Sequence, residues 1–158
     1  MTSETLVKAP RALHLAAPEG VDVVDLASRC VCRAQTTANC TIGFMGSERA
    51  IAQADPVALS RAFGCVLDNA VRAAGPGGHV TVEVHGTAHE TTVRVIDDGP
   101  GLGHVPIHNS LSLTVARALV RACGGGFDLR SGPAGGLVAR IVLLAADPGG
   151  WPPETVGV

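Results

Sequence analysis

Residues 67–101 read LDNAVRAAGPGGHVTVEVHGTAHETTVRVIDDGPG, and this stretch decides the fold. It opens on the end of an apolar-periodic helix, passes through the glycine turn 75–78, and continues in two alternating runs at 79–85 and 91–96. Alternating runs joined around a glycine predict a β-hairpin. The second run feeds directly into Asp97-Asp98-Gly99-Pro100-Gly101. A helix, a hairpin and a glycine-rich turn therefore follow one another without interruption.

The flanking sequence predicts further elements on both sides. Apolar spacing predicts a helix over 21–34, a second helix opened by Asp55-Pro56, and a third over 110–123. Aspartate is a good N-cap, and proline is accepted at the first helical position. Strands are predicted at 11–16, 41–45, 49–53, 127–131 and 136–144. This order predicts an α/β fold: one mixed sheet with helices on one face, a two-layer sandwich.

Composition bounds the class of protein. The chain has 158 residues, 46% of them hydrophobic, which fits one domain over 21–146 between a lead-in at 1–20 and a Pro/Gly tail at 147–158. A net charge of −2 without a basic block argues against a nucleic-acid surface. The longest apolar run, 137–146, is broken by Arg140 and falls short of the ~20 residues of a membrane helix. With no signal peptide visible, we expect a cytoplasmic protein, monomeric by itself and not inserted in a membrane.

The cysteines lack a paired metal-binding pattern. No CxxC occurs among the five, so spacing favours reduced, buried thiols over zinc ligands. They are Cys30, Cys32, Cys40, Cys65 and Cys123.

Two polar motifs are candidates for chemistry. On the helix opened by Asp55, helical spacing predicts one polar face opposite the apolar stripe, formed by Cys65, Asp68, Asn69 and Arg72. A solvated face would look the same. The segment 97–101, taken alone, has the composition of an ordinary turn.

Together, in this order, the two motifs resemble the ATP-binding domain of the GHKL superfamily. The likeness is greatest to the catalytic domain of bacterial sensor histidine kinases and spans residues 21–144. It implies a Bergerat-type fold that binds ATP and Mg²⁺. In that family the position of Asn69 holds Mg²⁺, and that of Arg72 contacts phosphate. The position of Asp97 accepts a hydrogen bond from the adenine amine, beside glycines that match Gly99 and Gly101.

The sequence departs from the family pattern around the phosphates. Cys65 stands where the family has a polar residue that activates the reacting group. The lid, 102–109, is short, and the glycines of the family's G2 box are replaced in 108–112, which reads HNSLS. Ser110, as a helix N-cap, and Ser112 are the residues left there to bind phosphate. These departures put phosphoryl transfer in question more than nucleotide binding.

The resemblance leaves more than one function open. His14 lacks the family's phosphoacceptor context, whereas His104 and His108 are lid candidates for phosphate contact. We therefore expect a stand-alone domain that passes the γ-phosphoryl group of ATP to a histidine on a partner, such as a histidine-containing phosphotransfer or dimerisation protein. The alternative is a degenerate module that docks on a kinase or response regulator. A third, an anti-sigma-factor serine kinase, fits less well because its G2 glycines are usually kept.

Overall fold

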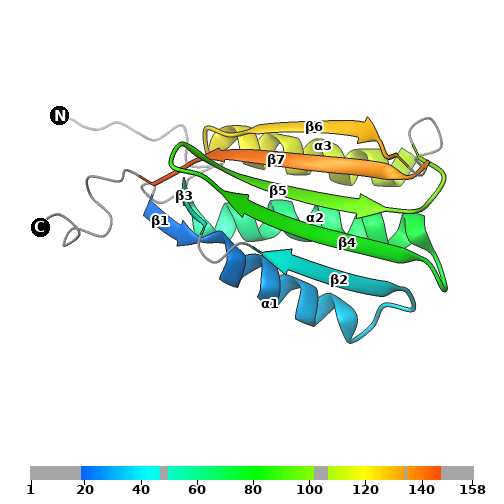
Figure 1. Cartoon of the computed structure of the whole chain (residues 1–158). Coiled ribbons are helices and arrows are strands. Elements are labelled where there is room, and N and C mark those ends of the chain that lie inside the picture. Colours follow the sequence, from blue (N-terminus) through cyan, green and yellow to red (C-terminus); the bar gives the residue numbers. More distant parts are fainter. Residues whose placement is uncertain (1–18, 47–49, 102–106, 134, 147–158) are drawn as a thin grey trace, which may run out of the picture.

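The computed structural model describes residues 19–46, 50–101, 107–133 and 135–146 (Figure 1). Its main feature is a five-stranded sheet with the order β2-β4-β5-β7-β6. The strands are β2 (Thr41–Gly46), β4 (His79–Gly86), β5 (Glu90–Asp97), β6 (Gly126–Ser131) and β7 (Leu137–Leu144). Because β2 pairs parallel with β4 while the other pairs are antiparallel, the sheet is mixed, as the sequence predicts.

The helices gather on one face of this sheet. They are α1 (Val23–Gln35), α2 (Pro56–Ala74) and α3 (Ile107–Ala122), and Figure 1 shows α2 and α3 running behind the strands. Between the layers lies an aliphatic core, which includes Leu59, Phe63, Val66, Val82, Val95, Val120 and Ile141. The two-layer α/β prediction is thus confirmed.

The opposite face of the sheet carries charge instead of helices. Glu83, Arg94, Arg140 and Asp128 stand opposite one another across β4, β5, β7 and β6. Arg94 lies 3.4 Å from Glu83, and Arg140 lies 3.0 Å from Asp128. A sheet with one buried and one charged face needs no second layer of helices.

Local signals fix both ends of α2. Asp55 is its N-cap, and the side-chain oxygen Oδ1 accepts from the N–H groups of Val57 at 2.8 Å and Ala58 at 3.2 Å. At the other end Gly75 adopts φ +70°, which favours glycine, and its N–H donates to the carbonyl of Val71. The predicted start and stop of this helix are both confirmed.

The N-terminal part differs from the prediction. Strand β1 (Glu19–Asp22) pairs antiparallel with β3 (Ile51–Ala54) in a separate two-stranded sheet, so the expectation of one sheet was wrong. Val21, expected in the first helix, pairs with Ala52, and Asp22 caps α1 by accepting from the N–H of Asp25 at 3.0 Å. Aspartate favours the N-cap over the helix interior, which moves the helix start by two residues. The expected lead-in 1–20 therefore contains the first two residues of a strand.

Helix α3 also begins earlier than expected, at Ile107 instead of Ser110. Ser110 is inside the helix and cannot be its N-cap, so that prediction was wrong. No glycine or proline occurs between 107 and 122, so nothing interrupts the helix back to Pro106.

The predicted strand 11–16, the tail 147–158, His14 and His104 lie outside the described residues. Among the helices that the structure describes, none is long and apolar enough to cross a membrane.

Candidate functional site

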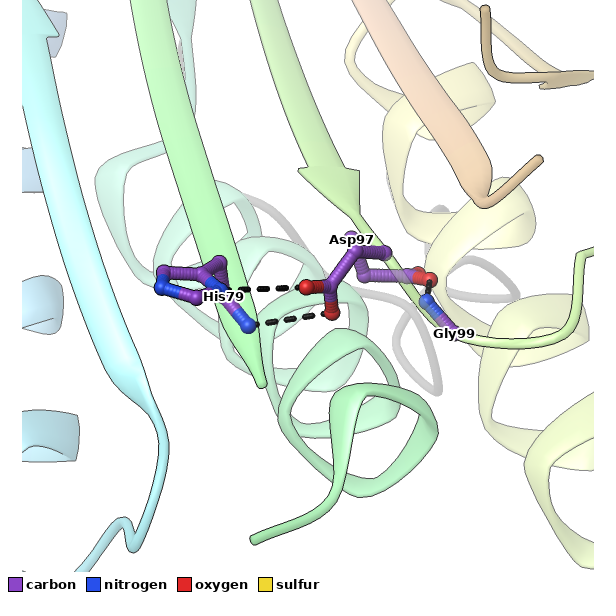
Figure 2. A network of polar contacts seen from close by, with 4 residues as sticks. His79, Asp97 and Gly99 are labelled. Atoms are coloured by element: carbon purple, nitrogen blue, oxygen red, sulfur yellow. Dashed lines mark hydrogen bonds and ion pairs between the residues drawn. The ribbon is translucent and has the colours of Figure 1, made fainter. Parts of the chain in front are cut away.

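A buried carboxyl group marks the end of β5. Asp97 is only 4% exposed, and its Oδ1 accepts a hydrogen bond from the N–H of Gly99 at 2.8 Å (Figure 2). Burial raises the pKa of Asp97 above its ordinary value, and the nearby charge of Asp98 acts in the same direction. The N–H groups of Gly99 and Leu137 lower the pKa by less than burial raises it. A carboxylate in this position is stabilised by any further hydrogen-bond donor that reaches it.

Backbone atoms pack closely against the turn that follows this carboxyl group, from two sides. A Cβ on Gly99 would overlap the carbonyl group of Ala73 on α2, and a Cβ on Gly136 would overlap the carbonyl group of Asp97 itself. Gly101 has φ +89°, and a Cβ there would lie 2.5 Å from the carbonyl oxygen of Gly135. The turn after β5 is therefore held between the end of α2 and the turn before β7, at distances that only glycine permits.

Asn69 lies on α2 one helical turn before Ala73, and residues four apart share a helix face. It is 3% exposed, and within the described part of the chain its oxygen Oδ1 is buried without a hydrogen-bond partner. A buried, unpaired amide oxygen costs about 1–3 kcal/mol, so it is the kind of atom that a ligand would satisfy. Mg²⁺ takes oxygen ligands and needs only one or two from protein, so Asn69 fits the predicted metal position.

The other residues of the predicted polar face are placed differently. Arg72 pairs with Asp68 at 3.1 Å, and both side chains are 54% exposed. Asn69 differs from both in being buried, so the predicted polar face is solvated at Asp68 and Arg72 but not at Asn69. Cys65 is half-buried, and its burial raises the pKa of the thiol; Arg61 lowers that pKa and Asp68 raises it, each by less.

The predicted role of Ser110 and Ser112 in phosphate binding receives limited support from the geometry. Ser112 is half-buried on α3, and Ser110 belongs to the same helix.

The described cysteines are all free thiols, and among the described residues no group of three His, Cys, Asp or Glu is arranged to hold a metal ion.

Three contributors to this site were not predicted from the sequence. Gly136 and Leu137 approach Asp97 from the start of β7, and His79 is joined to Asp98 on the β4 side. The paired glycines 135–136 before the last strand are a signal that could have pointed to the first two. Nothing in the sequence marks His79.

Comparison with known proteins gives one consistent result. The sequence pattern of histidine kinase-, DNA gyrase B-, and HSP90-like ATPases matches residues 54–147. The sensor protein KdpD of Mycobacterium tuberculosis is 31% identical over 115 residues, which cover 62% of this chain and 13% of that protein. This chain thus corresponds to a small part of the length of that sensor.

Solved structures show the same fold. The mycobacterial sensor histidine kinase MprB superposes with a TM-score of 0.72 at 24% identity, covering 81% of this chain and 97% of that structure. The ATP-binding domain of PrrB from Mycobacterium tuberculosis gives a TM-score of 0.65 at 24% identity, covering 82% and 97%. These likenesses show the fold, and the family pattern extends over more than half of the sequence, so the chain belongs to the histidine kinase-, DNA gyrase B- and HSP90-like ATPases.

Proposed function

We propose that this domain binds Mg-ATP and passes the γ-phosphoryl group to a histidine on a partner protein, in a cytoplasmic bacterial two-component system. The observation that carries the proposal is the buried carboxyl of Asp97, aligned by the N–H of Gly99, beside the helix that presents the unpaired oxygen of Asn69. The Asp97 carboxyl group suits an adenine amine, and the Asn69 amide oxygen suits a cation bound to phosphate.

Asp97 would select adenine. Its carboxylate accepts a hydrogen bond from the exocyclic amine, and the exclusion of water makes this bond discriminate strongly between bases. The glycine contacts that hold the turn after β5 keep the carboxyl group in place before the nucleotide arrives, which lowers the ordering cost of binding.

Asn69 and Arg72 would act at the phosphates. Asn69 would hold Mg²⁺ through Oδ1, and the bound ion would neutralise phosphate charge. Arg72 would exchange its contact with Asp68 for one with a phosphate oxygen. An exposed pair of this spacing is worth only about 0.3–0.5 kcal/mol, so the exchange costs little.

In the transfer, the bond between the γ-phosphorus and its bridging oxygen breaks and a bond to an imidazole nitrogen of the partner forms, with ADP as leaving group. A neutral imidazole attacks with the lone pair of its unprotonated nitrogen. The resulting imidazolium then loses the proton of its other nitrogen to solvent, so this domain does not have to supply a base. This agrees with Cys65, whose raised pKa keeps the thiol protonated at neutral pH and unfit to act as a base. We therefore assign catalysis to positioning and charge neutralisation.

One observation favours the second candidate, a docking module without transfer. Residues 107–112, which include the positions of the missing G2 glycines, are helical from Ile107 onward. A continuous helix has fewer conformations than a glycine loop with which to close on phosphates.

The test is calorimetric titration with a non-hydrolysable ATP analogue, with and without Mg²⁺. Wild type and Asp25→Asn, an exposed control on α1, should bind alike, whereas Asp97→Asn should lose binding. Asn69→Ala should keep the Mg²⁺-free affinity and lose the Mg²⁺-dependent gain. Asn39→Ala, an exposed asparagine, is its control.

Transfer is then tested with radiolabelled ATP and a purified histidine-bearing dimerisation domain. Label on that histidine, lost with Asn69→Ala, supports the kinase. Nucleotide binding without transfer to any such domain would favour the docking module, and no binding of wild type would refute the proposed function.

A further inference from the structure

A polar clamp joins the beginning of β4 to the end of β5, next to the candidate adenine site. The carboxylate of Asp98 accepts from the backbone N–H of His79 at 3.0 Å and contacts Nδ1 of the His79 ring at 3.1 Å (Figure 2). In return, the N–H of Asp98 donates to the carbonyl oxygen of His79 at 3.2 Å. These contacts close a ring between two residues on neighbouring strands.

The clamp holds the backbone from which the Asp97 side chain projects. Asp97 pairs with Val80 in the β4–β5 ladder, and the clamp extends that ladder by one residue. Of the other supports, Gly99 donates its backbone N–H to the Asp97 carboxylate, and Gly136 contacts the backbone carbonyl of Asp97. The clamp is therefore the support of Asp97 that contains ionisable side chains.

Among the described residues, the titratable group beside this pair on β5 is the carboxyl group of Asp97. On the other side the strand partner of His79 is Thr41, which does not titrate. The backbone N–H of His79, its ring and its charge lower the pKa of Asp98. Asp98 thus stays ionised over the range in which histidine changes its charge.

We propose that His79 and Asp98 are positioning residues that hold the Asp97 carboxyl group for adenine, and that protonation of His79 tightens this hold. The inference rests on the proposed function, because it concerns affinity for an adenine nucleotide. An imidazolium donates a charge-assisted hydrogen bond to Asp98, which is stronger than the bond from a neutral ring. Both side chains are partly exposed, 68% for His79 and 43% for Asp98, which limits the gain in affinity to about two- to fivefold.

The experiment compares nucleotide affinity at about pH 6 and about pH 8, on either side of the ordinary histidine titration. A non-hydrolysable ATP analogue is titrated into wild type, His79→Ala and His79→Arg. The control is His85→Ala, another exposed histidine of β4 that lies at the far end of the strand. The ratio of variant to wild-type Kd at each pH cancels the titration of the nucleotide itself.

We expect His79→Ala to weaken binding by about two- to fivefold at the lower pH and by less at the higher pH. His79→Arg, which keeps its charge, should match wild type at the lower pH and bind more tightly than wild type, by up to about two- to fivefold, at the higher pH. His85→Ala should follow wild type at both pH values. Equal weakening of His79→Ala at both pH values would reduce the clamp to a structural contact and overturn the proposed protonation effect. If His79→Ala has the same Kd as wild type at both pH values, the whole inference is overturned.

A further variant separates the two parts of the clamp. Asp98→Asn retains an oxygen that accepts from the backbone N–H of His79, but it loses the negative charge that attracts a protonated His79 ring. It should therefore abolish the difference between the two pH values in the effect of His79 on nucleotide affinity. Failure of wild type to bind at either pH would refute the proposed function, and the inference with it. Binding by wild type that none of these variants alters would refute the inference alone.

Discussion

Asp97 and Asp98 are neighbours in the chain with opposite surroundings. Asp97 turns inward and is desolvated, which raises its pKa, while Asp98 turns outward and accepts two hydrogen bonds from His79, which lower its pKa. The alternation of side-chain direction at the end of a strand produces this contrast. The sequence shows only two adjacent acids, so it predicts the site and not the difference between the two.

The pH dependence of folding should separate the two acids. In the folded state Asp97 retains its proton to higher pH than in the unfolded chain, so its contribution to stability falls as pH rises above its ordinary pKa. Asp98 behaves in the opposite way, and its contribution is present above the ordinary pKa and lost as pH falls. Urea unfolding from about pH 3 to about pH 7 tests this. Relative to Asp97→Asn, wild type should lose stability with rising pH, and relative to Asp98→Asn it should gain. Slopes of the same sign would contradict the assignment.

At the scale of elements, the predicted turn and helix signals account for most of the fold. Asp55-Pro56 and the glycine turn 75–78 determine α2 because capping and positive φ are local properties. The pairing of β1 with β3 was missed because it joins segments far apart in sequence and each strand is only four residues long. The burial of Asn69 was not predicted because only tertiary packing shows how far the buried part of α2 extends.

The contact of the turn after β5 with α2 can be tested with a pair of glycines. Gly99→Ala places a methyl group against the backbone of Ala73, so it should destabilise the domain by about 1–3 kcal/mol and weaken nucleotide binding. Gly64→Ala, on an open face of α2, should stabilise the domain by about 0.5–1 kcal/mol and leave binding unchanged. Urea unfolding and calorimetry measure both effects. If Gly99→Ala changes neither the free energy of unfolding nor the nucleotide affinity, the turn is free to move away from α2.

The early start of α3 leads to a prediction for the missing G2 glycines. The double change Ser110→Gly and Ser112→Gly should cost about 0.5–1 kcal/mol of stability per site, because glycine weakens a helix. It should also raise affinity for the ATP analogue, because freed backbone N–H groups can turn toward phosphate. Thr114→Gly, two residues further along the same helix, is the control for lost helicity. Affinity that does not rise above that of the control would contradict this prediction.

At the scale of the whole molecule, nucleotide binding should appear as added stability. A ligand that binds only the folded state at 100 times its Kd raises the free energy of unfolding by about 2.7 kcal/mol. We expect a shift of that size in urea unfolding of wild type with the ATP analogue and Mg²⁺, and none for Asp97→Asn. An equal shift in both proteins would mean that the nucleotide binds away from Asp97.

The backbone contacts around Asp97 also bear on how this domain can change over generations. Where a pocket wall is made of side chains, one substitution can be offset by another nearby, so the sequence of the wall can change over generations. Here Gly99, Gly101 and Gly136 press main chain against main chain, and no neighbouring substitution makes room for a methyl group. Mutational tolerance should therefore be very uneven: near zero at these glycines, and broad at the phosphate end, where family features have already been replaced. The proposed adenine site can thus be retained in descendants of this domain that have lost the chemistry it first served.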